Sequence, residues 1–211
     1  MDKRIKEILH LLAGEYPHIG PALNHKNPFQ LLVAVILSAQ TTDQQVNKVT
    51  EKLFTRIKGP ADILEMGSSW LEKQIRTLGL FRRKSQHIYE TSLQLMEKHG
   101  GCVPHTREEL QNLPGIGRKS AGVILSTVFG VPALAVDTHV ARVSRRLGLT
   151  DGSNPYVVEE DLCRLLPPDL WTMIHRRFIA HGRKICRARK PLCDECFLLP
   201  HCPQNFFGSG K

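Results

Sequence analysis

The chain has 211 residues, an ordinary apolar content of 41% and a formal net charge of +9. Such a positive balance favours a polyanionic partner, first nucleic acid and second an acidic membrane surface. No apolar run reaches the roughly 20 residues of a membrane-spanning helix, since the longest covers only residues 31–37. The N-terminal stretch also lacks the apolar region and cleavage site of a signal peptide, so we expect a soluble cytoplasmic protein.

Apolar residues follow helical spacing along most of the chain, and strand-like alternation is almost absent. We therefore expect an all-α protein with short connections. The predicted helices are, in chain order, the N-terminal segment, 28–40, 44–57, 70–79, 84–100, 108–113, 118–130, 137–148, a segment opened by Asn154-Pro155, and 168–182. The last residues, FFGSGK, are expected to fray.

Several of these helices begin with recognisable capping sequences. Asn27 and Asn154 each precede a proline, which is favoured at the first helical position. The pairs Ser69–Glu72 and Thr106–Glu109 have the spacing of a capping box.

The segment EELQNL-PGIG-RKSAGVIL predicts a helix, a tight turn and a second helix. Gly115 and Gly117 permit unusual backbone angles and close approach by a ligand. The second helix would present N–H groups and its positive dipole end to a phosphate, without reading bases. A phosphate-binding P-loop does not fit, because Arg118 replaces the glycine before the lysine and no strand precedes the turn. A plain turn between two packed helices remains the alternative, and Arg118 is a further candidate DNA contact.

Lys119 lies in the first turn of the second helix, on a face of small residues where a cleft is plausible. A lysine acts as a nucleophile only when it is neutral. The neighbouring Arg118 and the helix N-terminus both favour the neutral amine. The alternative is an ordinary solvated lysine.

Asp137 fits the N-cap of a helix that begins at Thr138, and capping keeps a carboxylate charged. It is either that cap alone or a carboxylate that also stabilises positive charge or deprotonates an amine in a cleft. Arg142 is expected to lie on a solvated, phosphate-facing side of this helix with Arg145 and Arg146. His139 is expected to be structural or a phosphate contact.

Four of the six cysteines fall near the C-terminus with the spacing C-x6-C-x2-C-x5-C. In a reducing compartment such a group favours a metal site over disulfides. The single CxxC pair suits an iron–sulfur cluster better than zinc, which usually takes two close pairs, but zinc and free thiols stay open. The first interval carries three cations that would make a phosphate clamp, Arg187, Arg189 and Lys190.

The segments LPGIGRKSAGVIL and AVDTHVARV and the cysteine spacing, in this order, resemble the endonuclease III family of DNA glycosylases, in the helix-hairpin-helix superfamily. The resemblance extends over nearly the whole chain, from NPFQLLVAVILSAQTTD onward. It implies removal of oxidised or ring-damaged pyrimidines from double-stranded DNA, followed by β-elimination at the abasic site.

The resemblance also implies a two-domain helix-hairpin-helix glycosylase fold. A six-helix domain would cover 22–132, and 1–21 would join 133–211 in an iron–sulfur domain, with DNA and the flipped base in the cleft between them. Lys119 would attack the sugar C1′ and Asp137 would assist. We expect a monomer with a [4Fe–4S] cluster held by Cys186, Cys193, Cys196 and Cys202.

Two further positions resemble family residues that fill the gap left by a flipped base. One is Gln40, and the other is Leu80 or Phe81 in the segment GLFRRKS. The alternatives are a polar residue at a helix end for Gln40 and ordinary core for Leu80.

Other functions remain conceivable from the same motifs. Relatives that act on mispaired adenine usually lack the hairpin lysine and carry an added C-terminal domain, so Lys119 and the end of the chain at residue 211 argue against that activity. A non-catalytic DNA-binding protein would use the hairpin, basic loop and metal for affinity alone. A redox sensor would couple DNA affinity to the state of the cluster.

Overall fold

The structure is a computed structural model that describes residues 1–203. These residues form helices and no strand, which confirms the predicted all-α class. The segment FFGSGK, predicted to fray, lies outside the described residues. The chain divides into two compact units, one of Pro21–Val131 and one of Met1–Gly20 together with the chain from Pro132 onward. Over the described part, every helix is too short or too polar to cross a membrane.

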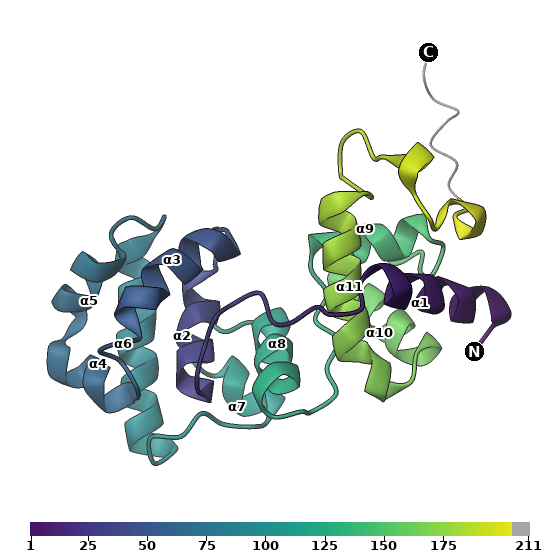
Figure 1. The fold of residues 1–211 in the computed structure, drawn as a ribbon. Coiled ribbons are helices and arrows are strands. Elements are labelled where there is room, and N and C mark those ends of the chain that lie inside the picture. Colours follow the sequence, from purple (N-terminus) through teal and green to yellow (C-terminus); the bar gives the residue numbers. More distant parts are fainter. Residues whose placement is uncertain (204–211) are drawn as a thin grey trace. The chain divides into compact units, whose positions relative to one another are not determined.

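Residues 21–131, all of which the structure describes, form seven α-helices, one more than expected (Figure 1). Every residue from Phe29 to Leu37 in α2 is buried, so α2 is the centre of this unit. The longest helix, α6, packs against α2, α4 and α5, while α8 packs against α2 and α7. The helices are α2 Pro28–Leu37, α3 Asp43–Leu53, α4 Pro60–Met66, α5 Ser68–Ile75, α6 Phe81–Lys98, α7 Arg107–Gln111 and α8 Arg118–Val128.

Most predicted helix starts are confirmed, and one is wrong. The side chains of Asn27, Thr106 and Asn154 each accept a hydrogen bond from a backbone N–H in the first turn of their helices. Ser69, by contrast, lies inside α5, which begins at Ser68 after Gly67. Gly67 adopts a positive φ of 78° and separates α4 from α5, so the serine is not needed as a cap.

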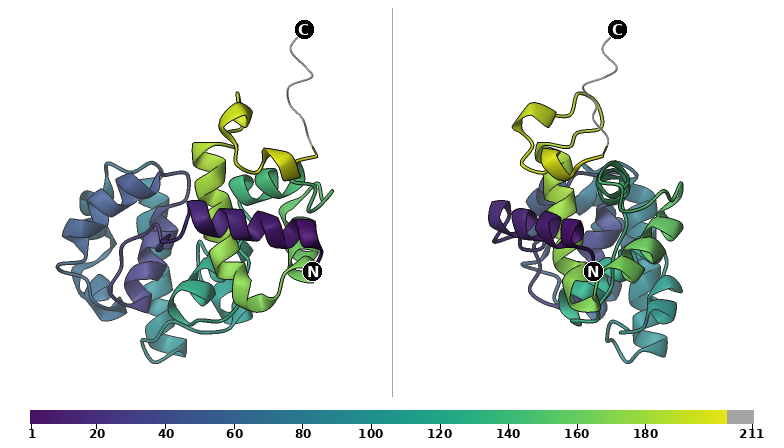
Figure 2. Two further views of the ribbon diagram at one scale, coloured as in Figure 1. Left: turned by 45° about the vertical axis from the view of Figure 1, so that its right-hand side comes forward. Right: turned by 90° about the vertical axis from the view of Figure 1, so that its right-hand side faces the viewer.

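The second unit is built around α11, which packs against α1 and α9, while α10 packs against α9 (Figure 2). The N-terminal helix therefore shares a core with segments more than 100 residues away. Fully buried Ile8 and Leu12 of α1 belong to the same apolar cluster as Val140 of α9 and Phe178 of α11. The helices are α1 Lys3–Glu15, α9 Thr138–Arg146, α10 Pro155–Leu165 and α11 Trp171–Lys184, with short 3₁₀ helices at Pro168–Leu170, Cys193–Glu195 and Leu199–His201.

Candidate functional site

The predicted hairpin is present, and α6 supports its turn. Gly115 has a φ of +81°, a conformation that side chains rarely adopt. A Cβ at Gly115 would also lie 2.7 Å from Nδ1 of His87, which is on α6. One helical turn further, the Thr91 hydroxyl donates to the carbonyl of Pro114 over 3.2 Å. Thr91 thus bonds the turn between α7 and α8 to α6, and His87 leaves no room for a side chain at Gly115.

Gly117 differs from Gly115, because its conformation does not require glycine. Its φ is −95° and its ψ is 179°, which any residue adopts. No atom would lie within 4 Å of a Cβ at this position. Gly117 is the N-cap of α8, and its carbonyl accepts the first helical bond from Ala121 N over 2.9 Å. The helix start is therefore approachable from outside, as a phosphate site requires.

Lys119 follows in the first turn of α8, and both Lys119 and Arg118 are exposed. The opposite side of the helix is buried in the unit through Ala121, Ile124 and Leu125. The amine of Lys119 is thus on the accessible side of α8, at the end where the approachable backbone lies.

Asp137 is confirmed as the N-cap of α9. Its Oδ1 accepts a hydrogen bond from Val140 N over 2.8 Å, and the residue is half-buried. The preceding residues Ala133 to Val136 are all buried. His175 of α11 donates through Nδ1 to the carbonyl of Ala135 over 2.6 Å, which fixes the segment that leads to Asp137.

The prediction that Arg142 lies on a solvated side of α9 is wrong. Its guanidinium donates to the carbonyls of Cys186 over 3.0 Å and Gly182 over 2.9 Å, and to Nδ1 of His139 over 3.1 Å. Burial lowers the pKa of His139, which keeps that ring neutral and able to accept the bond. Arg142 therefore ties α9 to the end of α11, and its role in binding DNA stays a prediction.

Gln40 and Leu80 share an unusual backbone conformation. Both have a positive φ, 52° for Gln40 and 58° for Leu80, although neither is glycine. Gln40 follows α2 and is exposed, while Leu80 precedes α6 and has 52% of its surface exposed. Phe81 is the first residue of α6 and is half-buried. Leu80 is thus not core, and it is the more accessible of the two candidate wedge residues in its loop.

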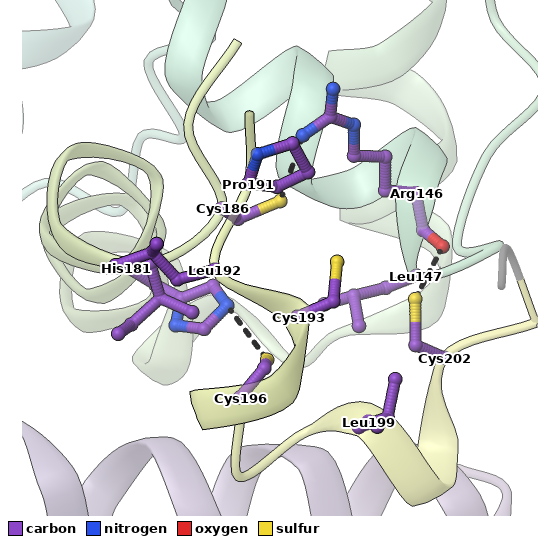
Figure 3. A pocket seen from close by; sticks show the side chains of 11 residues that line it. Arg146, Leu147, His181, Cys186, Pro191, Leu192, Cys193, Cys196, Leu199 and Cys202 are labelled. Carbon is purple, nitrogen blue, oxygen red and sulfur yellow. Dashed lines mark hydrogen bonds between the residues drawn. The ribbon is translucent and has the colours of Figure 1, made fainter. Parts of the chain in front are cut away.

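The four C-terminal cysteines line one hollow (Figure 3). None of the described cysteines forms a disulfide. Over residues 1–203, no three Cys, His, Asp or Glu side chains are grouped so as to hold a single metal ion. Cys186 lies two residues after α11, Cys193 begins a 3₁₀ helix, and Cys196 and Cys202 each directly follow one of the last two 3₁₀ helices.

Other hydrogen-bonding groups lie close to these sulfur atoms. Arg146 donates to Sγ of Cys186 over 3.4 Å, and its carbonyl accepts from Sγ of Cys202 over 3.2 Å. Nε2 of His181 lies 3.7 Å from Sγ of Cys196. Burial lowers the pKa of His181 to about 4, so its ring is neutral at physiological pH. Burial, with added repulsion from the other cysteines, raises the pKa of Cys193 and of Cys196.

The loop between the first two cysteines presents its three cations to solvent. Arg187, Arg189 and Lys190 are all exposed, as the phosphate-clamp interpretation expects. Arg146 fixes the loop by donating to the carbonyls of Arg187 over 2.7 Å and Ala188 over 3.2 Å. Arg146 is therefore a bridge between α9 and this loop, and the expectation that its side chain is simply solvated is wrong.

Comparison with known proteins places this chain in one protein family. Residues 33–168 match the model of the HhH-GPD superfamily of base excision DNA repair proteins. Endonuclease III of Bacillus subtilis strain 168 is 46% identical, with 96% of this chain and 93% of that protein covered. Endonuclease III of Escherichia coli K12 is 44% identical over 93% of each chain.

Solved structures agree with these relatives. A trapped covalent intermediate of an endonuclease III with DNA superposes with a TM-score of 0.90 at 44% identity, over 96% of this chain and 97% of that one. A thermostable thymine-DNA glycosylase superposes with a TM-score of 0.86 at 25% identity, over 95% and 96% of the two chains.

Proposed function

Because the chain belongs to the endonuclease III family of base excision DNA repair proteins, we propose that it removes oxidised or ring-damaged pyrimidines from double-stranded DNA. It is a DNA glycosylase with AP lyase activity, as its relatives are. Lys119 is proposed as the nucleophile that joins the two reactions. A solved relative has been trapped as a covalent intermediate with DNA, which supports a covalent route.

One observation carries this assignment of Lys119. The amine sits in the first turn of α8, two residues after the approachable backbone of Gly117. A backbone phosphate held by that helix start would place the adjoining sugar within reach of the lysine side chain. The same hairpin thus supplies both the anchor and the nucleophile.

The chemistry begins with attack of the neutral Lys119 amine on the sugar C1′. The C1′–N bond breaks, and the base leaves with its electron pair and takes up a proton. The attached amine gives one proton to a base, the C1′–O4′ bond breaks as O4′ takes up a proton, and a protonated imine forms between Lys119 and C1′. The imine acidifies the C2′ proton, whose removal expels the 3′ phosphate as the C3′–O bond breaks. Water then hydrolyses the imine and regenerates the amine.

Asp137 is proposed to support the positive charge that develops on the sugar and to accept a proton from the attacking amine. Its carboxylate already accepts the backbone N–H of Val140, which holds the group in place. A fixed, half-buried carboxylate costs little reorganisation when charge develops nearby.

The cysteine hollow is proposed to hold a [4Fe–4S] cluster. The residues fit, because four thiols line one hollow, Arg146 donates to Sγ of Cys186, and Nε2 of His181 lies within 3.7 Å of Sγ of Cys196. When bound, the cluster supplies a rigid cross-link and an electron-transfer centre. The chain's own residues then present the cations Arg187, Arg189 and Lys190 to DNA phosphates.

Gln40 and Leu80 are proposed to enter the base stack when the damaged nucleotide is flipped out. Both are exposed and both have a fixed, left-handed backbone, which suits side chains that must stay extended against a duplex. We further propose that the protein acts as a cytoplasmic monomer. Light scattering of the protein alone and with duplex DNA would check the monomer.

The lysine assignment is tested by borohydride reduction on a duplex with one ring-damaged pyrimidine. Wild-type protein should form a stable crosslink, and Lys119→Ala should lose crosslinking and strand cutting by at least about a thousandfold. Lys73→Ala, an exposed lysine on α5, is the matched control and should react as wild type. If Lys119→Ala crosslinks normally, Lys119 is not the nucleophile. If wild-type protein binds DNA yet releases no base, a non-catalytic DNA-binding protein is the better interpretation.

A further inference from the structure

Lys84 is a buried lysine in the first turn of α6. Only 3% of its surface is exposed, although lysine is almost never buried without a partner. Its ammonium donates to Oγ1 of Thr41 over 2.6 Å. Its backbone N–H donates to the carbonyl of Leu80 over 3.0 Å. The backbone bond is the first helical bond of α6, which any residue would make, so the side chain alone ties the Thr41 loop to the start of α6, directly after Leu80.

The bond to Thr41 reaches both neighbours of Gln40. The Thr41 hydroxyl accepts from Lys84 and donates to the carbonyl of Ala39 over 3.3 Å. Gln40 lies between Ala39 and Thr41 with a φ of 52°. A non-glycine residue keeps such a backbone only where its surroundings hold it there. The Lys84–Thr41–Ala39 chain of hydrogen bonds supplies that restraint.

The other end of this restraint is the start of α6, which directly follows Leu80. Leu80 has a φ of 58°, and its carbonyl accepts the Lys84 N–H at the start of α6. Over residues 1–203, the non-glycine residues with positive φ are Gln40, Leu80 and Lys190. The Lys84 side chain leaves α6 four residues after Leu80 and bonds to Thr41, so it joins the regions of Leu80 and Gln40, which are 40 residues apart in the sequence.

Stability alone does not account for a lysine at this position. Burial lowers the pKa of Lys84, which means that the surroundings disfavour its charged form. The Thr41 hydroxyl satisfies one donor of an ammonium that has three. An apolar side chain of similar length would fill the same space at no such cost.

We propose that Lys84 is a positioning residue that holds the Gln40 and Leu80 loops in one fixed arrangement, so that both side chains enter the DNA stack together. The inference rests on the proposed wedge roles. Lys84 touches neither substrate nor reacting atoms, and it acts through the two loops. Base extrusion from an intact stack depends on this arrangement. Cutting at an abasic site depends on it less, because no base has to be unstacked there.

The test compares Lys84→Met with Thr41→Val, which removes the acceptor but keeps the side-chain shape. Base release from a damaged-pyrimidine duplex should fall about tenfold for each, the scale of one hydrogen bond to a charged group. Strand cutting at a preformed abasic site should change less than about twofold. The fluorescence rise of 2-aminopurine placed beside the lesion, which reports unstacking, should be slowed to a similar extent in both variants. Lys98→Met, exposed on the same helix, should match wild type in every assay.

Two further measurements separate positioning from folding. The unfolding temperature of Lys84→Met should equal or exceed that of wild type, because a buried ammonium has been removed. The double variant Lys84→Met/Thr41→Val should be no worse than either single one, since both remove the same bond. Equal losses of base release and abasic-site cutting, or a drop in unfolding temperature that accounts for the loss, would overturn the inference.

The results for wild-type protein distinguish a failure of the proposed function from a failure of the role proposed for Lys84. Absence of base release and of the 2-aminopurine signal in wild type would overturn the proposed function itself. Normal wild-type activity and signal, with an unchanged Lys84→Met, would overturn only the role of Lys84.

Discussion

Gly115 and Gly117 lie in one turn, yet they are glycine for different physical reasons. Gly115 needs a positive φ and sits against His87, whereas Gly117 needs neither and has open space beside it. We expect Gly115→Ala to destabilise the protein by about 1–2 kcal/mol, since alanine is strained in the left-handed region and its Cβ would clash. Gly117→Ala should cost less, up to about 1 kcal/mol, because alanine is a poorer N-cap than glycine, and it should weaken DNA binding, because a methyl group would hold a phosphate away.

Denaturant unfolding and fluorescence anisotropy with an abasic-site duplex measure the two effects separately. The two variants serve as each other's control, because they differ by one methyl group in the same turn. Undiminished DNA affinity in Gly117→Ala would show that the start of α8 does not contact the phosphate backbone.

Asp137 is confirmed as a helix cap, and a catalytic role is proposed for it as well. The variant Asp137→Asn distinguishes the two roles. An asparagine side chain at this position would still accept the Val140 N–H, because asparagine caps helices as well as aspartate does. We therefore expect Asp137→Asn to unfold within about 0.5 kcal/mol of wild type but to release base at least about tenfold more slowly. Asp137→Ala should lose about 1 kcal/mol of stability as well. Wild-type turnover in Asp137→Asn would mean that the residue is only a cap.

Among the elements, those with strong local signals were predictable from sequence. The starts at Asn27 and Asn154 and the α7–α8 hairpin follow from side-chain chemistry within a few residues. α4 was missed because its seven residues are too few to show a helical period. Its signals were Pro60 at the first helical position and Asp62, whose carboxylate accepts the Gly59 N–H over 2.9 Å. The prediction of Ser69 as a helix cap was wrong for a related reason. Gly67 precedes the first residue of α5 and has no side chain that could show the helix start in the sequence.

Arg146 of α9 holds the loop after Cys186 through two backbone carbonyls, and this contact gives a prediction at the scale of the element. Arg146 donates to the carbonyls of Arg187 and Ala188. Without these bonds the loop should open more often, so trypsin should cut Arg146→Met after Arg187 or Arg189 about fivefold faster than wild type. Arg145→Met is the control, because Arg145 is exposed and donates within its own helix to Ala141. Equal cutting of the two variants would mean that Arg146 does not restrain the loop.

At the scale of the whole molecule, sequence motifs indicated which residues belong to the candidate site. They did not indicate the side-chain contacts that position those residues. The cysteine spacing and the three cations of the following loop were readable, since they are local. The approach of Lys84 to Thr41 and of His181 to Cys196 depends on packing between distant segments. A lone lysine or histidine in a helix carries no sequence signal of such a contact, because burial is set by the tertiary fold.

The four C-terminal cysteines belong to the unit that contains α1 and α9–α11, and the proposed cluster would help to hold that unit together. Wild-type protein prepared without oxygen should contain iron and sulfide near four of each per chain, if the proposed cluster is bound. Cys196→Ser should lose most of the iron, and its segment from 187 to 201 should become sensitive to protease, because a thiolate ligand and its contact with His181 are gone. Cys102→Ser is the matched control, since Cys102 is exposed and lies in the other unit. Stoichiometric zinc without sulfide in wild-type protein would show that the site binds zinc and not an iron–sulfur cluster. Full iron content in Cys196→Ser would show that Cys196 is not a ligand.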